Sequence, residues 1–308
     1  MIIISEFMDD AAVKRLQRHH AVIYEPDLFD RPDDLRAGLG GARALIVRNR
    51  TQVTRALLDH APMLECIGRL GVGLDNIDVA RCGERDISVF IASGANDQCV
   101  AEYVIGTSLA LLRGAYAVNA QMIRGDWPRN TCAGREAQGK TLGLIGFGAI
   151  GQRTARIAAA VGMVPIASDP YLPPDSEGWQ FARQAGLPEI LETSDVVTLH
   201  VPLLPETRHL LDANAFNSMK PGALVINTSR GDVIDEEALV DCLQRGHLAG
   251  CALDVYADEP LSVDSGRKFA GLDNIILTPH IAGVTRESIP RVSTMIVEKV
   301  LEHLQSRN

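Results

Sequence analysis

The sequence predicts an α/β protein with two domains, each built on a parallel sheet that helices cover on both faces. Short apolar runs alternate with helical patterns over residues 1–92, and the same alternation starts again at residue 141. The 308 residues are enough for two domains of about 150 residues each. A glycine-rich turn joins the first strand of the second set to a helix. Together these features predict Rossmann-like and flavodoxin-like domains.

The first set of elements is compact. Its expected strands are Ile2–Ile4, Ala21–Tyr24, Ala44–Val47, Leu64–Ile67 and Ser88–Ile91. Its expected helices are Ala11–His19, Pro32–Leu39, Thr54–His60 and Val79–Arg85. Turn residues at 93–97 mark a candidate domain boundary, and the apolar stretch 100–113 predicts a helix. This helix is too short to cross a bilayer, so we expect it to be buried between domains or subunits.

The second set contains six expected strands, which match a complete dinucleotide-binding sheet. They are Leu142–Ile145, Val164–Ala167, Val196–His200, Ala223–Asn227, Gly250–Leu253 and Ile275–Leu277. The expected helices are Gln152–Val161, Gly178–Gly186, Pro188–Thr193, Asp212–Met219 and Glu236–Arg245. Residues 114–140 are expected to be irregular. A last helix, residues 286–308, has an apolar stripe and no strand of its own, so it could return to the first domain.

The glycine-rich turn has the spacing G-x-G-x-x-G, from Gly146 through Gly148 to Gly151. Gly146 permits a tight turn, Gly148 lets the backbone approach a pyrophosphate, and Gly151 lets the helix lie close to the strand. The N–H groups at the start of the helix then face the anion. A plain turn in an α/β unit is the alternative. The strand before and the helix after the turn favour dinucleotide binding.

An acidic residue follows at the expected distance. Asp169 ends the apolar strand Val164–Ala167, and its carboxylate can accept hydrogen bonds from the adenosine ribose. Its charge would repel a 2′-phosphate, and no Arg or Lys follows before Arg183. NAD is therefore favoured over NADP as the cofactor. The alternative is a strand-end turn residue before Pro170.

Composition excludes several classes of protein. The net charge of −9 and the absence of a basic run argue against a nucleic-acid partner. No apolar stretch is long enough for a membrane span. The six cysteines form no C-x-x-C pair, and no histidine cluster has metal-ligand spacing. We therefore expect no bound metal, reduced thiols and a cytoplasmic location.

Two loops of the first set are candidates for anion binding. Arg48 and Arg50 follow the strand Ala44–Val47, and Arg69-Leu-Gly71-Val-Gly73 follows another strand. Loops at the carboxyl ends of parallel strands form the binding crevice of such sheets. A glycine-rich loop there can present backbone N–H groups to a carboxylate. Solvated arginines and a plain glycine turn are the alternative.

Three candidates for catalysis follow late strands of the second set. They are Arg230, Glu259 and His280. Reduction of a 2-keto acid needs a cation for the carboxylate and a proton donor for the carbonyl oxygen, roles that suit arginine and histidine. A carboxylate beside the histidine would favour the imidazolium. Each residue could instead be structural, because spacing alone does not show that Glu259 reaches His280.

Several long motifs resemble the D-isomer-specific 2-hydroxyacid dehydrogenase family, which includes phosphoglycerate dehydrogenases. The resemblance covers nearly the full length. It rests on the segments 71–78, 125–127, 139–151, 194–209, 219–231, 253–256, 259–260 and 279–283, in the family's order. Ala149 departs from the family, which often has Arg or another polar residue there, so one pyrophosphate contact could be missing.

The resemblance implies roles for individual residues. Arg230 would bind the substrate carboxylate and carbonyl, His280 would be the acid/base, and Glu259 would orient it. The implied cofactor-binding residues are Gly146, Gly148, Ala149, Ile150, Gly151, Asp169, Val201, Pro202, Thr207, Thr228, Asp254, His280 and Gly283. The implied substrate-binding residues are Arg48, Arg69, Leu70, Gly71, Val72, Gly73 and Arg230.

The resemblance also implies a domain organisation. Residues 1–96 with 284–308 would form a flavodoxin-like substrate domain, and residues 97–283 an NAD-binding Rossmann domain, with a cleft between the domains. The family's usual homodimer would form through the NAD domain, including the helix at 100–113.

The implied reaction is reversible hydride transfer between NAD(H) and a small 2-hydroxy or 2-keto acid. Arg48 occupies a position where some family members hold a second anionic group, which suggests a substrate of the 3-phosphoglycerate or 3-sulfolactate type. A glyoxylate or hydroxypyruvate reductase is the alternative. An NAD(H)-sensing binding protein on the same scaffold is an alternative of another class. A formate dehydrogenase is less consistent with the sequence, because that branch normally pairs its histidine with glutamine.

Overall fold

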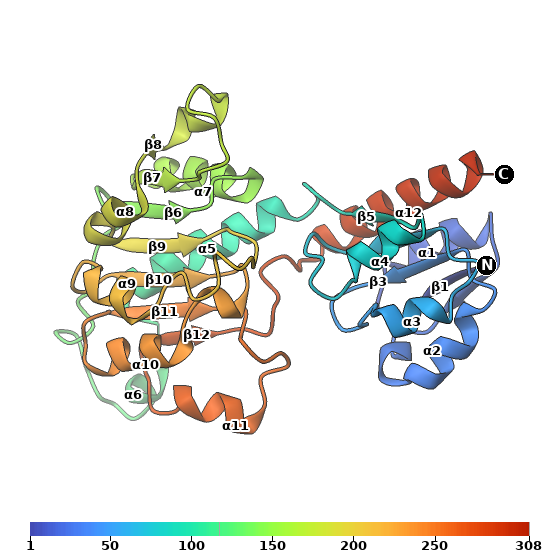
Figure 1. The fold of residues 1–308 in the computed structure, drawn as a ribbon. Coiled ribbons are helices and arrows are strands. Elements are labelled where there is room, and N and C mark those ends of the chain that lie inside the picture. The colour runs from blue at the N-terminus through green and yellow to red at the C-terminus, as the bar shows by residue number, and fades with distance from the viewer. Residues whose placement is uncertain (117, 308) are drawn as a thin grey trace. The chain divides into compact units, whose positions relative to one another are not determined.

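The computed structural model describes residues 1–116 and 118–307. The chain forms two compact units, Met1–Asn96 with Gly283–Asn308, and Asp97–Ala282 (Figure 1). Each unit contains one sheet, and all named strand pairs in both sheets are parallel. The predicted fold class, two α/β domains with parallel sheets, is confirmed.

The first unit has a five-stranded sheet in the order β2-β1-β3-β4-β5. Its strands are β1 (Ile2–Ile4), β2 (Val22–Tyr24), β3 (Ala44–Val47), β4 (Cys66–Arg69) and β5 (Ser88–Ile91). This is the flavodoxin-like order, in which the chain runs outward in both directions from a switch point between β1 and β3. The fourth strand begins two residues later than predicted, since Leu64 and Glu65 lie before it.

Helices cover both faces of this sheet. Side chains of β1 alternate: Ile2 and Ile4 join one apolar cluster, and Ile3 joins the other. The first cluster contains α1 (Asp10–Gln17) and α12 (Ser288–Ser306), and the second contains α2 (Pro32–Leu39), α3 (Arg55–Asp59) and α4 (Val79–Glu84).

The C-terminal helix returns to this first sheet, as the sequence suggested. Val292, Ile296, Val300 and Leu304 of α12 are buried in the cluster that also contains β1 and β3, whereas Ile289 is only half-buried. Asn308, the last residue of the predicted helix, lies outside the described residues.

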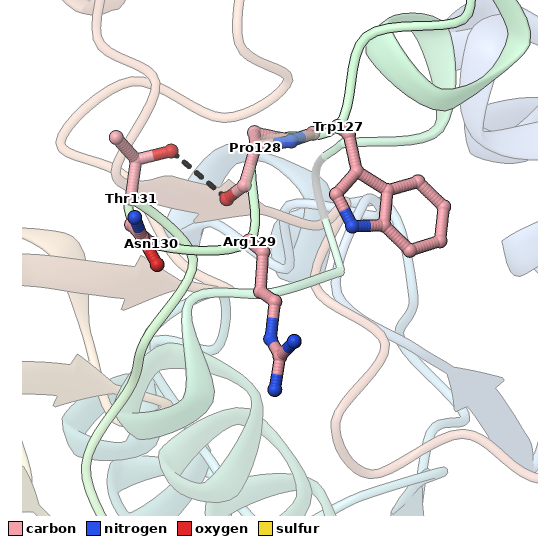
Figure 2. Close-up of a pocket in the computed structure, with 5 residues that line it drawn as sticks. All are labelled: Trp127, Pro128, Arg129, Asn130 and Thr131. Atoms are coloured by element: carbon pink, nitrogen blue, oxygen red, sulfur yellow. Dashed lines mark hydrogen bonds between the residues drawn. The ribbon is translucent and has the colours of Figure 1, made fainter.

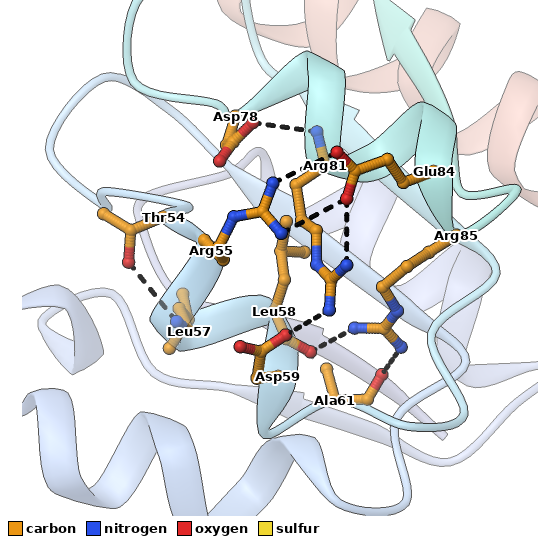
Figure 3. A network of polar contacts seen from close by, with 10 residues as sticks. All are labelled: Thr54, Arg55, Leu57, Leu58, Asp59, Ala61, Asp78, Arg81, Glu84 and Arg85. Atoms are coloured by element: carbon orange, nitrogen blue, oxygen red, sulfur yellow. Dashed lines mark hydrogen bonds and ion pairs between the residues drawn. The ribbon is translucent and has the colours of Figure 1, made fainter.

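The two shortest helices of the first unit are held by polar contacts. Thr54 caps α3 and Asp78 caps α4. Figure 3 shows Arg81 of α4 between Asp59 and Glu84, with ion pairs of 2.7 and 2.9 Å. Arg85 donates a 2.6 Å hydrogen bond to the Ala61 carbonyl oxygen after α3. Helices of this length are not stable alone, so these contacts help to fix them against the sheet.

The second unit has a seven-stranded sheet in the order β12-β11-β10-β9-β6-β7-β8. The strands are β6 (Thr141–Ile145), β7 (Val164–Ser168), β8 (Arg183–Gln184), β9 (Val196–Leu199), β10 (Leu224–Asn227), β11 (Gly250–Leu253) and β12 (Ile275–Leu277). The six predicted strands are present. The seventh, β8, lies within the segment predicted as the helix 178–186. That prediction is wrong: a 3₁₀ turn, Glu177–Phe181, precedes a short edge strand.

Helices again cover both faces. Helices α5 (Asp97–Arg113) and α7 (Ala149–Ala160) contribute to the apolar cluster on one face. Helices α8 (Leu187–Thr193), α9 (Ala213–Ser218) and α10 (Glu236–Gln244) contribute to the cluster on the other. The apolar helix expected between domains or subunits therefore buries Val104, Ile105 and Leu112 against the sheet of its own unit.

Three further local predictions differ from the structure. Helix α7 begins at Ala149, inside the glycine motif and three residues before the predicted Gln152, and buries Thr154, Ala155 and Ala158. Two short helices lie in segments predicted without structure, α6 (Asn119–Ile123) and α11 (Val263–Gly266). The buried face of α7 contains small residues, Ala155 and Ala158 among them, which let the helix pack close to the strands.

The described residues contain neither a membrane-spanning helix nor a metal-binding cluster. No helix there is long and apolar enough to span a membrane. The same residues contain no group of three or more His, Cys, Asp or Glu side chains that could hold a metal ion. None of the six cysteines, all of which are described, is in a disulfide, and five of them are buried.

Candidate active site

The glycine turn lies between β6 and α7, next to the switch point of the second sheet, where β6 adjoins β9. Gly146 has φ 91°, and a Cβ there would lie 2.5 Å from the His200 carbonyl oxygen. A Cβ on Gly151 would lie 2.6 Å from the Gly146 oxygen. Both glycines are therefore required by the fold itself, for the turn and for the close approach of α7.

Gly148 is different from these two glycines. It has φ −71°, an ordinary value, and a Cβ added there would have no atom of the described residues within 4 Å apart from its chain neighbours and its own helix. Gly148 is the N-cap of α7 and contributes no capping side chain to the helix N-terminus. Internal packing does not explain a glycine here. The open space in front of a helix N-terminus suits an approaching phosphate group.

Asp169 holds the turn from the end of β7. Its Oδ2 accepts a 2.8 Å hydrogen bond from the Phe147 amide, and its Oδ1 accepts a 2.9 Å bond from the Tyr171 amide. A carboxylate oxygen can accept more than one hydrogen bond. The half-buried Asp169 can thus fix the glycine turn and still accept from ribose hydroxyls.

A second indication of a bound ligand comes from Thr228, directly after β10. Its Oγ1 is buried and has no hydrogen-bond partner among the described residues. Unsatisfied buried hydroxyls are uncommon and often mark an unseen ligand or water. Gly148, Asp169 and Thr228 lie after β6, β7 and β10 at one sheet edge, so these residues fit a dinucleotide.

His280 and Glu259 form a pair at the same carboxyl edge. His280 Nδ1 lies 2.7 Å from Glu259 Oε2. The other carboxylate oxygen, Oε1, accepts a 3.1 Å bond from the Tyr256 amide. Burial alone would raise the pKa of the Glu259 carboxyl, but hydrogen bonds from His280 and Tyr256 and the charge of Arg230 lower it below its usual value. Glu259 is therefore held ionised against the imidazole.

The backbone around His280 is held by Asp254, at the end of β11. This carboxylate is only 1% exposed. It accepts hydrogen bonds from the Thr278 hydroxyl at 2.6 Å and from the amides of Ile281 and Ala282 at 2.8 and 2.7 Å. His280 itself has φ 55°, a left-handed conformation that is uncommon for a residue with a side chain. The network accounts for how this strained position is maintained.

Arg230 lies in the loop after β10. Asn227 donates a 2.8 Å hydrogen bond to the Arg230 carbonyl oxygen. The next residue, Gly231, packs so closely on Tyr256 that a Cβ would lie 1.9 Å from the Tyr256 carbonyl carbon. The Arg230 loop thus lies against the segment that leads to Glu259. The structure brings the three predicted catalytic residues to one edge of the second sheet.

Sequence reasoning missed two residues of this edge. Tyr256 donates its hydroxyl to the carbonyl oxygens of Leu253 and Thr278, at 3.1 and 3.0 Å, and its amide to Glu259. Tyr103 of α5 lies 2.6 Å from the Thr278 hydroxyl. A buried tyrosine two residues after Asp254 was a visible signal. Tyr103 is remote in sequence and gave no signal.

The arginines of the first unit have different surroundings. Burial lowers the pKa of the half-buried Arg48 guanidinium, an effect that the Glu6 carboxylate partly opposes. Arg50 stacks on Phe29, 3.9 Å from the ring centroid, and pairs with Asp30 at 3.3 Å. Arg69 is 8% exposed and donates a 3.0 Å bond to the Leu70 carbonyl oxygen. Arg48 is thus the arginine of the β3 loop best suited to bind a ligand anion.

The remaining predicted residues fall into two groups. In the first unit, Leu70 is buried, Gly71 and Gly73 lie in the same loop, and Val72 is 37% exposed. In the second, Thr207 accepts a 2.7 Å bond from the Leu204 amide and donates a 2.6 Å bond to the Pro202 oxygen. Thr207 therefore shapes its own loop, which begins at Val201 after β9. Ile150 lies in the first turn of α7, and Gly283 accepts a hydrogen bond from Ser288.

Comparison with known proteins identifies the family. Residues 105–282 match the model of the D-isomer specific 2-hydroxyacid dehydrogenase, NAD binding domain. The (S)-sulfolactate dehydrogenase of Chromohalobacter salexigens is 49% identical over 307 residues, 99% of each chain. The hydroxypyruvate reductase of Thermotoga maritima is 39% identical over 272 residues, 88% of each chain.

A solved structure has the same fold over the whole chain. The D-lactate dehydrogenase of Aquifex aeolicus, complexed with NAD and lactic acid, superposes with a TM-score of 0.89 and 29% identity, over 99% of this chain and 95% of that one. The predictions of the family and of NAD as cofactor are confirmed. The chain belongs to the D-isomer specific 2-hydroxyacid dehydrogenase family and is an NAD-dependent oxidoreductase that acts on the CH–OH group of hydroxy acids.

Proposed function

We propose that this enzyme interconverts a small 2-hydroxy acid that carries a second anionic group, of the 3-sulfolactate type, and the corresponding 2-keto acid. The observation that carries the reaction type is the His280–Glu259 pair, 2.7 Å apart, at the sheet edge that also carries Arg230 and the glycine turn. The (S)-sulfolactate dehydrogenase relative supports the substrate class.

The proposed roles follow from the chemistry of each side chain. Bound NAD supplies or accepts the hydride. Arg230 binds the substrate carboxylate and polarises the carbonyl, because its planar guanidinium suits paired oxygens. His280 donates a proton to the carbonyl oxygen during reduction and removes it during oxidation. Glu259 orients the imidazole and stabilises its protonated form.

We assign cofactor binding and Arg230 to the second unit, and further contacts with the substrate to the first. Gly148, Asp169 and Thr228 would receive the pyrophosphate, the adenosine ribose and another polar group of NAD. Asp254, a cofactor-binding residue by the family resemblance, would act mainly by holding the His280 turn, because its oxygens already accept three protein hydrogen bonds. The Arg69–Gly73 loop would contact the substrate through backbone N–H groups.

Arg48 is proposed to bind the second anionic group. Its guanidinium has no hydrogen-bond partner within residues 1–116 and 118–307, and lies 5.9 Å from the Phe7 ring centroid. A buried cation that has no hydrogen-bond acceptor in the protein can form strong charged hydrogen bonds with a ligand anion. A substrate such as glyoxylate, which has no second anion, would not use it.

Oxidation of NADH, followed at 340 nm, tests this function against a panel of 2-keto acids that includes 3-sulfopyruvate, 3-phosphohydroxypyruvate, hydroxypyruvate and glyoxylate. We expect the highest kcat/KM with 3-sulfopyruvate. Arg48→Ala should raise KM strongly for that substrate and barely for glyoxylate. Equal small effects on both would remove the second-anion assignment. No turnover alongside tight NADH binding would instead support a sensor.

We also propose that the protein forms a homodimer, in which another copy of this chain binds through the second unit. Three large apolar side chains in α6 and the turn after it are exposed: Met122 by 42%, Ile123 by 87% and Trp127 by 76%. Trp127 also helps to line a pocket of about 410 Å³, together with Pro128, Arg129, Asn130 and Thr131. Figure 2 shows these five residues. Apolar groups gathered in this way are typical of protein interfaces.

Light scattering at several concentrations tests the dimer. Ile123→Asp should shift the dimer towards monomer. Val263→Asp should not, although Val263 of α11 is also highly exposed, by 81%. A monomer at all concentrations in the unmodified protein would contradict the proposal. The free thiols support a reducing, cytoplasmic location.

A further inference from the structure

The loop that carries Arg48 has an unusual support. It follows β3, beside β1, at the switch point of the first sheet, where ligands bind in open α/β sheets. The backbone of this loop, Arg48–Thr51, is bound by buried polar side chains that come from the ends of both neighbouring strands. Neither side chain belongs to the set of residues predicted from the sequence.

Glu6 binds the loop from the end of β1. Its side chain belongs to a residue that is only 3% exposed. Oε1 accepts hydrogen bonds from the amides of Arg48 and Thr51, at 2.8 and 3.0 Å, and Oε2 accepts one from Arg50 at 3.1 Å. Hydrogen bonds to a charged group are stronger than neutral ones, so one buried carboxylate fixes three of the four loop residues.

Asn76 binds the same loop from the other side. It lies in the glycine-rich loop after β4 and is 9% exposed. Its Nδ2 donates to the carbonyl oxygens of Arg48 at 3.1 Å and Thr51 at 2.7 Å. The amides and the carbonyls at both ends of the loop are therefore held by two different side chains. The glycine-rich substrate loop and the Arg48 loop are thereby tied together.

We propose that Glu6 and Asn76 are positioning residues that aim the Arg48 guanidinium at the second anionic group of the substrate. This inference rests on the proposed function. Within the described residues no acceptor holds the guanidinium itself, so its direction depends on the backbone from which it projects. Glu6 has a further effect, because its charge offsets part of the cost of burying the Arg48 cation.

A comparison of two substrates distinguishes the positioning roles of Glu6 and Asn76 from a general loss of stability. In Glu6→Gln one acceptor oxygen remains for three amide donors, and the NH₂ group opposes at least one of them. We expect KM for 3-sulfopyruvate to rise on the order of 10- to 100-fold, as for a misplaced binding group. KM for glyoxylate and Kd for NADH should change less than about twofold, because neither uses Arg48. Asn76→Ala should show the same selectivity from the other side of the loop.

A matched control is Glu65→Gln. Glu65 pairs with Arg43 just before β4, at the opposite edge of the same sheet, with Nη2 3.1 Å from Oε2. This variant should lower thermal stability without changing either KM. In an Arg48→Ala background, Glu6→Gln should add no further rise in KM for 3-sulfopyruvate, because the group that it positions is gone.

The outcomes are distinguishable. If Arg48→Ala is selective for 3-sulfopyruvate and neither Glu6→Gln nor Asn76→Ala is, the positioning role is wrong and the proposed function stands. Equal rises in KM for both keto acids in the Glu6 and Asn76 variants also overturn it. If Arg48→Ala itself affects both substrates equally, the second-anion function fails, and the positioning role fails with it. Should Glu6→Gln not fold, Asn76→Ala carries the same test.

Discussion

Replacing Glu259 by glutamine should slow keto-acid reduction while leaving cofactor binding intact. Two donors face this carboxylate: the His280 ring nitrogen at 2.7 Å and the Tyr256 amide at 3.1 Å. Glutamine has one acceptor oxygen where glutamate has two. Whichever way the amide is turned, its NH₂ group faces one of these partners, and the negative charge opposite the imidazole is lost.

The magnitude follows from these contacts. An unsatisfied donor costs about 1–3 kcal/mol, and a charged hydrogen bond is stronger than a neutral one by roughly 1 kcal/mol. A conservative total of about 2 kcal/mol corresponds to roughly 30-fold in kcat. We expect the loss in kcat, because the protonated imidazole is needed in the transition state, with Kd for NADH unchanged.

Steady-state reduction of 3-sulfopyruvate and fluorescence titration of NADH measure the two quantities. Glu237→Gln is the matched control, because Glu237 is in the same unit and its side chain is 78% exposed. A fall in kcat of less than about threefold, or an equal fall in the control, would refute the role of Glu259 as the residue that orients His280.

Two further predictions concern cofactor binding and acid stability. Gly148→Ala should leave the unfolding temperature unchanged and weaken NADH binding several-fold, since the new Cβ would enter only the space proposed for the ligand. Gly146→Ala should destabilise the protein by more than about 1 kcal/mol, because it forces a Cβ against His200 at φ 91°. Calorimetry with and without NADH measures both effects. Burial would raise the pKa of Asp195, but the Lys220 ion pair at 2.9 Å and the Thr141 amide lower it below 3.8. The ionised carboxylate therefore stabilises the fold above pH 3.8, and this stabilisation is lost as the pH falls through the lowered pKa of the folded state. The free energy of unfolding in urea should depend less on pH below 3.8 for Asp195→Asn than for the parent protein.

Local sequence pattern was sufficient for most elements, and the failures have physical reasons. Apolar runs located the strands because parallel strands are buried on both faces. Strand β8 was missed because it is only two residues long and both, Arg183 and Gln184, are polar and exposed, so this edge strand has no apolar run to mark it. The start of α7 was placed three residues late, at Gln152, because its N-cap is Gly148, which has no capping side chain to signal a helix start.

In the candidate site, too, some residues could be predicted from the sequence and others could not. Arg230, Glu259 and His280 were recognisable because each follows a predicted strand and has a side chain suited to the reaction. Glu6 and Asn76 were not, because an acidic residue after a strand and an asparagine in a glycine-rich turn are usually solvated. Their role depends on which strand ends are neighbours, and β1, β3 and β4 are brought together only by the sheet order.

The sequence alone determined the α/β class, the glycine turn with Asp169, the family, and the three residues proposed for catalysis. These depend on local periodicity, turn chemistry and residue type, which are written within short segments. Tertiary structure decided the 2.7 Å contact between His280 and Glu259, the support of Arg48 by Glu6 and Asn76, and the hydrogen bonds that Asp254 accepts from the segment after β12. Hydrogen bonds require two groups to meet within about 3 Å, and for residues distant in sequence only the packed sheets bring them to that distance.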